Sequence, residues 1–241
     1  MVGRKTVTGT LYLVGVGPGD PELMTLKAVR LLGEIAVVAY PDPGNGSAMA
    51  YEIARTHINP HAILLPMSLP MQVERDAGQA AYDAGAEAIG AHLAERRDVA
   101  YLCEGDPLFY GSAMYLIGRL GAAFGIGIVP GVTSLTAAAA ATGRPLAARN
   151  EVLKVLPGPL PDEILRRELV AADAVAIIKV GRHLERIRAL LRETGHEAGA
   201  TVVRHASTGR QHVAKLAECE GTELPYFSMI LSYRGGENWG R

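Results

Sequence analysis

The 241-residue sequence predicts an α/β protein with two α/β domains, the first built on a mainly parallel sheet and the second on a mixed sheet. In the first part, short apolar runs alternate with helical patterns, as in strands joined by crossover helices. After Thr201 the apolar runs follow one another too closely for a helix at each connection, so antiparallel pairing is expected. The segment TGRPLAARN, which contains Pro145, interrupts the pattern. We therefore expect domains at residues 1–147 and 148–241.

The first domain is expected to be doubly wound. Its predicted strands are Leu11–Val16, Ile35–Tyr40, Ile63–Pro66, Val99–Cys103 and Ile126–Val129, and its predicted helices are Pro21–Leu32, Ser47–Thr56, Glu74–Arg96, Ser112–Ala123 and Ser134–Thr142. Pro21 suits the first position of a helix, where its missing N–H needs no partner, and Glu22 complements the helix dipole. Ligands of such sheets bind at the C-terminal ends of the strands, where the Gly-rich loops of this sequence lie.

The second domain is expected to contain fewer helices than strands. Its predicted strands are Val152–Leu156, Val175–Val180, Thr201–His205, Gln211–Leu216 and Tyr226–Tyr233, and its predicted helices are Asp162–Val170 and His183–Glu193. The closing stretch RGGENWGR is rich in glycine and is expected to be disordered.

Composition narrows the class of protein. The chain is 49% hydrophobic and 20% charged, with a formal net charge of -1, so it lacks the basic excess of a nucleic-acid-binding protein. It has neither an apolar run long enough to cross a membrane nor the apolar core of a secretory signal. Cys103 and Cys219 lie far apart, and the seven histidines form no ligand spacing. We expect a cytoplasmic protein without a disulfide or a bound metal.

The stretch LYLVGVGPGD reads as a buried strand that ends in a Gly-rich loop. Gly15 and Gly17 fit the first two glycines of the G-x-G-x-x-G dinucleotide fingerprint, but Asp20 stands at the third. A carboxylate there would repel a pyrophosphate. The loop is therefore expected to permit close backbone approach to a ligand other than a dinucleotide. A tight turn that binds nothing remains the alternative.

Two further strands end in similar loops. In VAYLCEGDPLFYGSAMYL, Gly105 leaves room for a ligand against the backbone, and Asp106 offers an acceptor, although a local Asx turn is the favoured explanation of Asp106 taken alone. In IGIVPGVTSLTAAAA, Pro130-Gly131 precedes Thr133 and Ser134, which suit the N-cap of an Ala-rich helix. Three such strand ends in one sheet are expected to surround a single crevice.

Together these motifs resemble a known family. GVGPGDPELMTLKA, CEGDPLFYGS and VPGVTS, in this order, are similar to the tetrapyrrole (corrin/porphyrin) methylases, and VAIIKVGRHL and PYFSMILSY match the second domain of that family. The resemblance implies an S-adenosylmethionine (SAM) dependent methyltransferase, a homodimer, with its active site in the cleft between two domains. EGDPLFYGSAMYL, GRPLAARNEVLKVLPG and PYFSMI are most similar to the members that methylate C20 of precorrin-2 to give precorrin-3A in cobalamin biosynthesis.

The resemblance also implies site residues. Those expected to contact SAM are Pro18, Glu104, Gly105, Asp106, Phe109, Thr133, Ser134, Val180 and Ala206. Those expected to contact the tetrapyrrole are Gly17, Gly19, Asp20, Ser112, Arg144 and Arg149. Candidates for a base that removes the C20 proton are Asp20, Asp106 and Tyr110. The substrate carries many carboxylates, so Arg144, Arg149, Arg182, Arg204 and Arg210 are candidates for a basic rim, although for any single one an ordinary surface arginine is the favoured alternative.

One departure from the family pattern bears on the substrate. Members that methylate uroporphyrinogen carry an arginine where this chain has Ser112, after Tyr110-Gly111, which argues against that substrate. A cobalt-containing form of precorrin-2 remains an alternative. Two alternatives belong to other classes of protein. A nicotinamide oxidoreductase is disfavoured by Asp20, and a non-catalytic binding protein is disfavoured because it would need fewer specialised strand ends than this sequence has.

Overall fold

A computed structural model describes residues 8–44, 48–69 and 75–234. The chain divides into two compact units, residues 1–133 and 134–241. Both are α/β, as the sequence predicts. The division falls before the expected boundary at residue 147 because helix α5 (Ser134–Thr142) packs on two strands of the second unit. Residues 235–241, the greater part of the tail expected to be disordered, lie outside the described residues, as do the expected helix starts Ser47 and Glu74.

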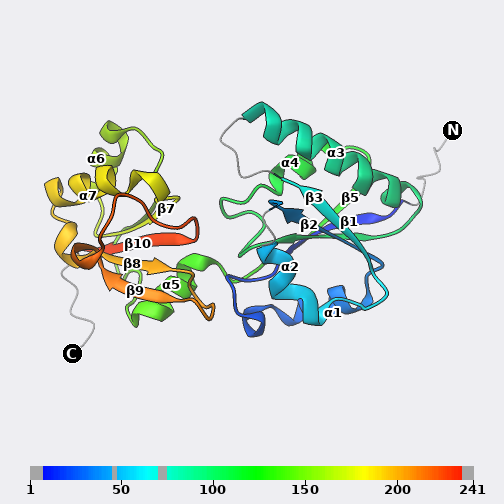
Figure 1. Cartoon of the computed structure of the whole chain (residues 1–241), viewed down its shortest axis with the longest axis horizontal. Helices are drawn as coiled ribbons and strands as arrows, with labels where there is room; N and C mark the ends of the chain where they lie inside the picture. Colours follow the sequence, from blue (N-terminus) through cyan, green and yellow to red (C-terminus); the bar gives the residue numbers. More distant parts are fainter. Residues whose placement is uncertain (1–7, 45–47, 70–74, 235–241) are drawn as a thin grey trace. The chain divides into compact units, whose positions relative to one another are not determined.

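The first unit holds a five-stranded sheet whose strands all run parallel, in the order β3-β2-β4-β1-β5 (Figure 1). The strands are β1 (Thr10–Gly15), β2 (Val37–Asp42), β3 (Ile63–Ser68), β4 (Val99–Cys103) and β5 (Gly125–Val129). The prediction of a parallel, doubly wound sheet is confirmed. Strand β1 lies between β4 and β5, so the three Gly-rich loops that follow these strands leave the sheet side by side.

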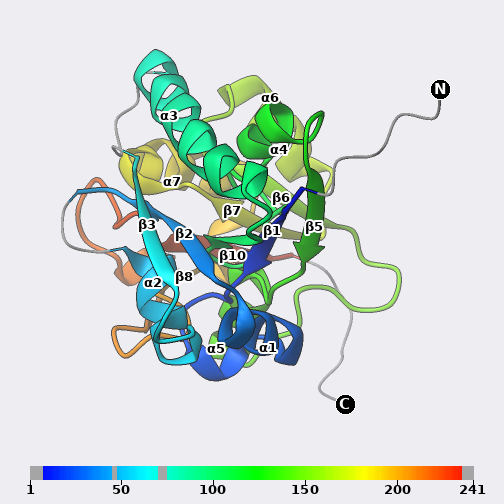
Figure 2. The same cartoon turned by 90° about the vertical axis from the view of Figure 1, so that its right-hand side faces the viewer.

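Side chains that alternate along the strands divide the core of the first unit into two layers. Leu11 and Leu13 of β1 pack with helices α3 and α4, whereas Val14 packs on the opposite face with α1 and α2. Figure 2 shows the two helix pairs on opposite sides of the sheet. The helices are α1 (Leu26–Glu34), α2 (Met49–Ala54), α3 (Arg75–Ala94) and α4 (Met114–Leu120), with a short 3-10 turn at Arg55–His57. Because both faces are covered, the strands are almost uniformly apolar.

The prediction of a single helix over Pro21–Leu32 is wrong, because the segment forms two separate pieces. A 3-10 turn covers Pro21–Leu23, and α1 begins only after Thr25. Each piece has its own cap, because the Asp20 side chain accepts a hydrogen bond from the Glu22 N–H (2.9 Å) and the Thr25 hydroxyl accepts one from the Ala28 N–H (3.2 Å).

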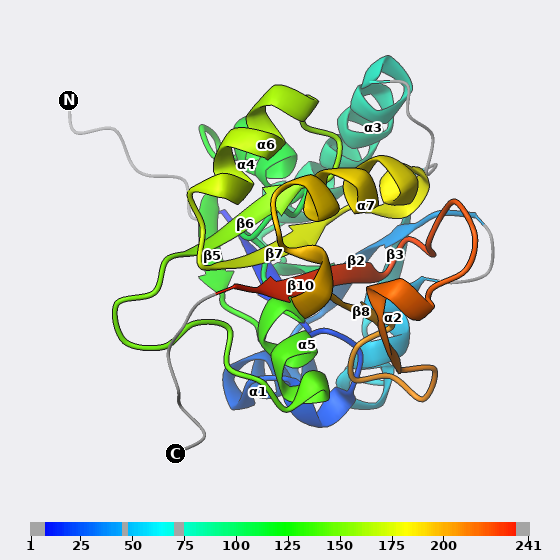
Figure 3. The ribbon, with the colours of Figure 1, turned by 90° about the vertical axis from the view of Figure 1, so that its left-hand side faces the viewer.

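The second unit holds a mixed five-stranded sheet in the order β6-β7-β10-β8-β9 (Figure 3). Its strands are β6 (Leu153–Pro157), β7 (Ala174–Ile178), β8 (Thr201–Arg204), β9 (His212–Lys215) and β10 (Ser228–Tyr233). Strand β6 pairs parallel with β7, and the other pairs are antiparallel. The expected mixed sheet is therefore confirmed, including the short strand near Gln211.

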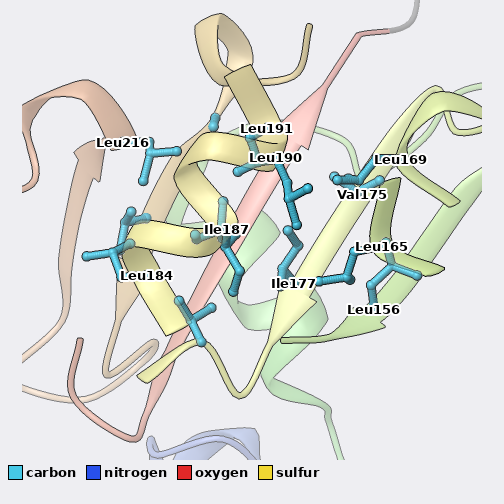
Figure 4. Packing of buried hydrophobic residues seen from close by; sticks show 14 of the residues in the cluster. Leu156, Leu165, Leu169, Val175, Ile177, Leu184, Ile187, Leu190, Leu191 and Leu216 are labelled. Atoms are coloured by element: carbon cyan, nitrogen blue, oxygen red, sulfur yellow. The ribbon is translucent and has the colours of Figure 1, made fainter. Parts of the chain in front are cut away.

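Helices α6 (Asp162–Val170) and α7 (Leu184–Glu193) cover one face of this sheet, and α5 packs on β8 and β10. Short 3-10 turns cover Gly181–His183, Glu197–Gly199 and Leu216–Glu218. Figure 4 shows leucines of α6 and α7 packed on Ile177 of β7. Each buried leucine or isoleucine stabilises the unit by about 1.5 to 3 kcal/mol. Across residues 8–44, 48–69 and 75–234, every helix is too short or too polar to span a lipid bilayer.

Candidate active site

The sheet of the first unit has a topological switch point between β1 and β4. These strands are neighbours, yet the helix that follows β1 packs on one face and the helix that follows β4 packs on the other. Chains that leave adjacent strands in opposite directions leave a crevice at the C-terminal edge of the sheet, which is where α/β proteins bind ligands. The loops that the sequence singles out leave the sheet at this edge.

Backbone hydrogen bonds join the first two loops across this switch point. The Gly105 N–H donates to the Gly17 carbonyl (2.8 Å), and the Gly17 N–H donates to the Gly105 carbonyl (3.3 Å). Both glycines have positive φ, +84° for Gly17 and +66° for Gly105, a conformation that side chains disfavour. Gly105 is therefore required for the backbone path itself, and the residue is buried where the sequence suggests open space for a ligand.

The third loop packs against the other two through backbone atoms alone. A Cβ placed on Gly131 would lie 2.0 Å from the Gly105 carbonyl oxygen, and one on Gly15 would lie 2.6 Å from the Gly131 nitrogen. No side chain fits at either position without a backbone shift. The sequence alone does not single out Gly15 or Gly131 for this role, because Gly15 simply ends the apolar strand β1 and Gly131 follows β5 by two residues.

Asp106 ties the second loop to the third. One carboxylate oxygen accepts from the Leu108 N–H (2.9 Å), which is the local turn considered from sequence, and the other accepts from the Gly131 N–H (3.0 Å). A carboxylate held by two backbone donors fixes the spacing of the loops that carry them. We call this arrangement of Asp106, Leu108 and Gly131 the Asp106 clasp.

An exposed apolar surface follows the Asp106 clasp along the chain. The exposed fractions are 57% for Leu108, 43% for Tyr110 and 55% for Met114, and the rings of Phe109 and Tyr110 meet edge to face at 5.1 Å. Tyr110 has φ +54°, an uncommon conformation for an aromatic residue and one that tends to mark functional sites. Ser112, two residues on, is exposed.

The Glu104 carboxyl lies near the backbone of Ala50 in α2. The residue is exposed as a whole, but atoms packed around its carboxyl raise its pKa above the ordinary value, against the opposing effect of backbone hydrogen bonds at Glu104 itself and at Ala50.

The other sequence-predicted residues of the first unit lie close by in the chain. Pro18, Gly19 and Asp20 are half-buried in the first loop, and Asp20 already caps the Glu22 N–H. Thr133 is the last residue of the first unit, and Ser134 is the first residue of α5 in the second. The first unit thus brings Gly17 and Gly105 together directly and places Asp106 beside the loop that leads to Thr133.

In the second unit, Val180 and Ala206 lie at one edge of the sheet, after β7 and after β8. The Val180 side chain is fully buried in the core, so only its backbone is available to a ligand. Strained backbone surrounds both residues, with φ of +56° at Lys179, +47° at His205 and +62° at Ser207.

This edge is rich in cations. Burial and the nearby Arg210 and Arg204 lower the pKa of His205, and burial with Arg186 and Arg182 lowers that of His183. Both histidines are therefore neutral near pH 7, and the arginines carry the positive charge. Arg182, Arg204 and Arg210 thus lie near His183 and His205, at the edge that carries Val180 and Ala206.

Arg144 and Arg149 belong to a different part of the second unit. Arg144 stacks on Tyr233 at the end of β10, and the turn that contains Arg149 is tied to the same tyrosine through Glu151. Strand β10 runs antiparallel to β7, so its end lies opposite the edge that carries Val180. Within this unit the structure separates the two arginines from Val180 and Ala206.

Comparison with known proteins identifies relatives of the chain. The family model of the Tetrapyrrole (Corrin/Porphyrin) Methylases matches residues 10–220. A precorrin-2 C(20)-methyltransferase from Sinorhizobium sp. is 40% identical over 92% of this chain and 94% of its own length. A cobalt-precorrin-2 C(20)-methyltransferase from Salmonella typhimurium is 30% identical over 93% and 96%.

Two further comparisons extend this result. The cobalamin biosynthesis protein CobIJ of Mycobacterium tuberculosis is 44% identical over 92% of this chain. That relative is longer, and the match covers 46% of its length. The solved structure of a uroporphyrin-III C-methyl transferase from Thermus thermophilus, complexed with S-adenosyl homocysteine, has a TM-score of 0.69 at 28% identity and covers 93% of this chain and 92% of its own. The match over residues 10–220 and the full-length relatives show that the chain belongs to the tetrapyrrole (corrin/porphyrin) methylases.

Proposed function

We propose that the protein transfers a methyl group from SAM to C20 of precorrin-2 and so forms precorrin-3A in cobalamin biosynthesis. The observation that carries this proposal is the 40% identity, over nearly the whole of both chains, to a relative named for that reaction. The lower identity of 30% to the relative named for cobalt-precorrin-2 favours the metal-free substrate. We also propose a homodimer, which the family resemblance implies, and a cytoplasmic location, which rests on the cysteine usage of the sequence.

The residues present fit SAM better than a dinucleotide. The Asp20 carboxylate caps the Glu22 N–H and so occupies the helical N-terminus at which a pyrophosphate would bind. Pro18 and Gly19, which follow the buried Gly17, are half-buried and leave loop backbone accessible to an uncharged adenosine and an amino-acid group. We propose that the loops at Pro18, Gly105 and Thr133 hold SAM, together with the Val180 backbone and the Ala206 region.

When bound, SAM supplies an electrophilic methyl group on a sulfonium, and the methyl–sulfur bond breaks as the bond to C20 forms. The chain's task is to hold the reactants in line and exclude water. The loops joined at Gly17 and Gly105 and by the Asp106 clasp provide a fixed frame for this alignment.

Because both Asp106 oxygens already accept backbone N–H groups, we propose that Asp106 positions the loops. Asp20 and Tyr110 then remain as candidates for the group that takes the proton from C20.

The direct test of the function uses SAM labelled with carbon-13 in its methyl group and purified precorrin-2. We expect the product to gain one methyl group by mass spectrometry and NMR to locate the label at C20. Parallel incubation with the cobalt complex of the substrate tests the metal-free assignment. Label at another carbon, or preferential methylation of the cobalt complex, would contradict the proposal.

We expect S-adenosylhomocysteine to stabilise the protein against heat and NAD to have no effect, because Asp20 blocks the pyrophosphate position. Thermal-shift titration measures both, and the shift should grow with the logarithm of free ligand over its dissociation constant. Stabilisation by NAD without stabilisation by S-adenosylhomocysteine would remove the basis of the proposed function.

A further inference from the structure

A pocket in the second unit lies away from the edge that carries Val180 and Ala206. Its lining includes Thr142, Arg144 and Leu146, which follow or end α5, and Val175, Thr201 and Tyr233 from the sheet. Val175 stands near the start of β7, whereas Val180 follows the end of that strand. The pocket is therefore at the opposite edge of the sheet, and the proposed SAM contacts of this unit do not account for it.

Arg144 is the cation of this pocket. Its guanidinium carbon lies 4.1 Å from the centre of the Tyr233 ring, and its Nε is buried without a hydrogen-bond partner. The Tyr233 hydroxyl donates to the Glu151 carboxylate, which also accepts from the Ala148 N–H (2.8 Å). The ring on which Arg144 stacks is therefore held in place from its far end.

The chemistry of the lining identifies the class of ligand. A guanidinium only donates hydrogen bonds, so the partner that Arg144 lacks is an acceptor, and its charge favours an anion. The hydroxyls of Thr142 and Ser232 already donate to the carbonyls of Ala139 (2.9 Å) and His196 (2.6 Å). Across the part of the chain that the structure describes, no carboxylate forms an ion pair with Arg144.

We infer that this pocket receives a carboxylate, with Arg144 as its donor and Tyr233 as the platform that fixes the guanidinium plane. Under the proposed function, on which this inference rests, the carboxylate is an acidic side chain of the tetrapyrrole. A free carboxylate or phosphate from solution offers the same chemistry and is the alternative source.

The test compares Arg144→Gln and Arg144→Lys with Arg30→Gln, which removes the same charge from an exposed position on α1. We expect Arg144→Gln to raise the KM for precorrin-2 at least tenfold, with kcat and the affinity for S-adenosylhomocysteine within twofold of wild type. The KM of Arg144→Lys should lie between those of wild type and Arg144→Gln, because lysine keeps the charge and loses the planar fork of the guanidinium. Arg30→Gln should match wild type in every measurement.

A second arm measures stabilisation of the wild type by acetate and by phosphate in thermal shift. If the KM is unchanged but either anion stabilises wild type and not Arg144→Gln, the pocket binds a free anion. If neither the KM nor the anion shift responds, the inference is overturned. Loss of S-adenosylhomocysteine binding in folded Arg144→Gln would also overturn it. Failure of the proposed function is recognised separately, because wild type would then not methylate precorrin-2.

Discussion

Purified protein should methylate precorrin-2 once and leave uroporphyrinogen III unchanged under the same conditions. Ser112 stands where the family resemblance places an arginine in members that methylate uroporphyrinogen, and it is exposed beside Tyr110. A substrate carboxylate left without that cation costs about 2 to 5 kcal/mol, which corresponds to a factor of roughly 30 or more in rate. Mass spectrometry of both reactions, run with equal enzyme and SAM, measures the difference.

The control is stabilisation of the same enzyme preparation by S-adenosylhomocysteine, which shows that the methyl-donor site is intact when uroporphyrinogen is unreactive. Methylation of uroporphyrinogen III at a rate comparable to that of precorrin-2 would assign the chain to a different activity within the family. It would also mean that Ser112 does not mark the substrate preference.

Replacing Gly131 with alanine should be strongly destabilising and should weaken S-adenosylhomocysteine binding at least tenfold. The new Cβ would lie 2.0 Å from the Gly105 carbonyl oxygen and 2.9 Å from the Gly15 Cα, so backbone must move. Overpacking costs about 1 to 3 kcal/mol, and contact with backbone places this site near the upper end. For a chain of this size the melting temperature should fall by roughly 6 to 12 °C.

The matched control is Gly118→Ala in α4, where a Cβ meets nothing within 4 Å. Alanine is favoured over glycine inside a helix, so this variant should be stabilised by about 0.5 to 1 kcal/mol. The same chemical change should thus have opposite signs at the two glycines. If Gly131→Ala has the melting temperature of wild type and binds S-adenosylhomocysteine with the same affinity, the three loops are not in the close contact described.

Most of the fold could be predicted because its signals are local. Helix α6 follows the expected bounds of Asp162–Val170, since its apolar residues recur at helical spacing, and β4 follows Val99–Cys103 as an uninterrupted apolar run. The break between the 3-10 turn at Pro21–Leu23 and α1 could not be predicted from the hydrophobic pattern alone, because it depends on Thr25 acting as a second N-cap. Likewise, the packing of α5 on the second unit is decided by contacts distant in sequence.

The candidate site, like the fold, could be predicted only where its signals are local in the sequence. The sequence predicts the three loops, and the structure places them on adjacent strands. It could not predict that Asp106 bonds to Gly131, because that contact joins residues 25 positions apart and either residue has a simple local explanation. The stacking of Arg144 on Tyr233 is equally non-local, and a lone arginine in a loop reads as a surface residue until its neighbour is known.

The Asp106 clasp and the glycine contacts fix the spacing of the loops independently of the side chains that the loops expose. Spacing depends on backbone atoms and one carboxylate, whereas Leu108 and Met114 expose their apolar side chains beyond the clasp. A library that randomises these two positions should therefore sample many surfaces on one unchanged frame. For anyone who wishes to redirect the enzyme to another macrocycle, the loop beyond the clasp is the place to begin, and Gly15, Gly105 and Gly131 are the positions to leave alone.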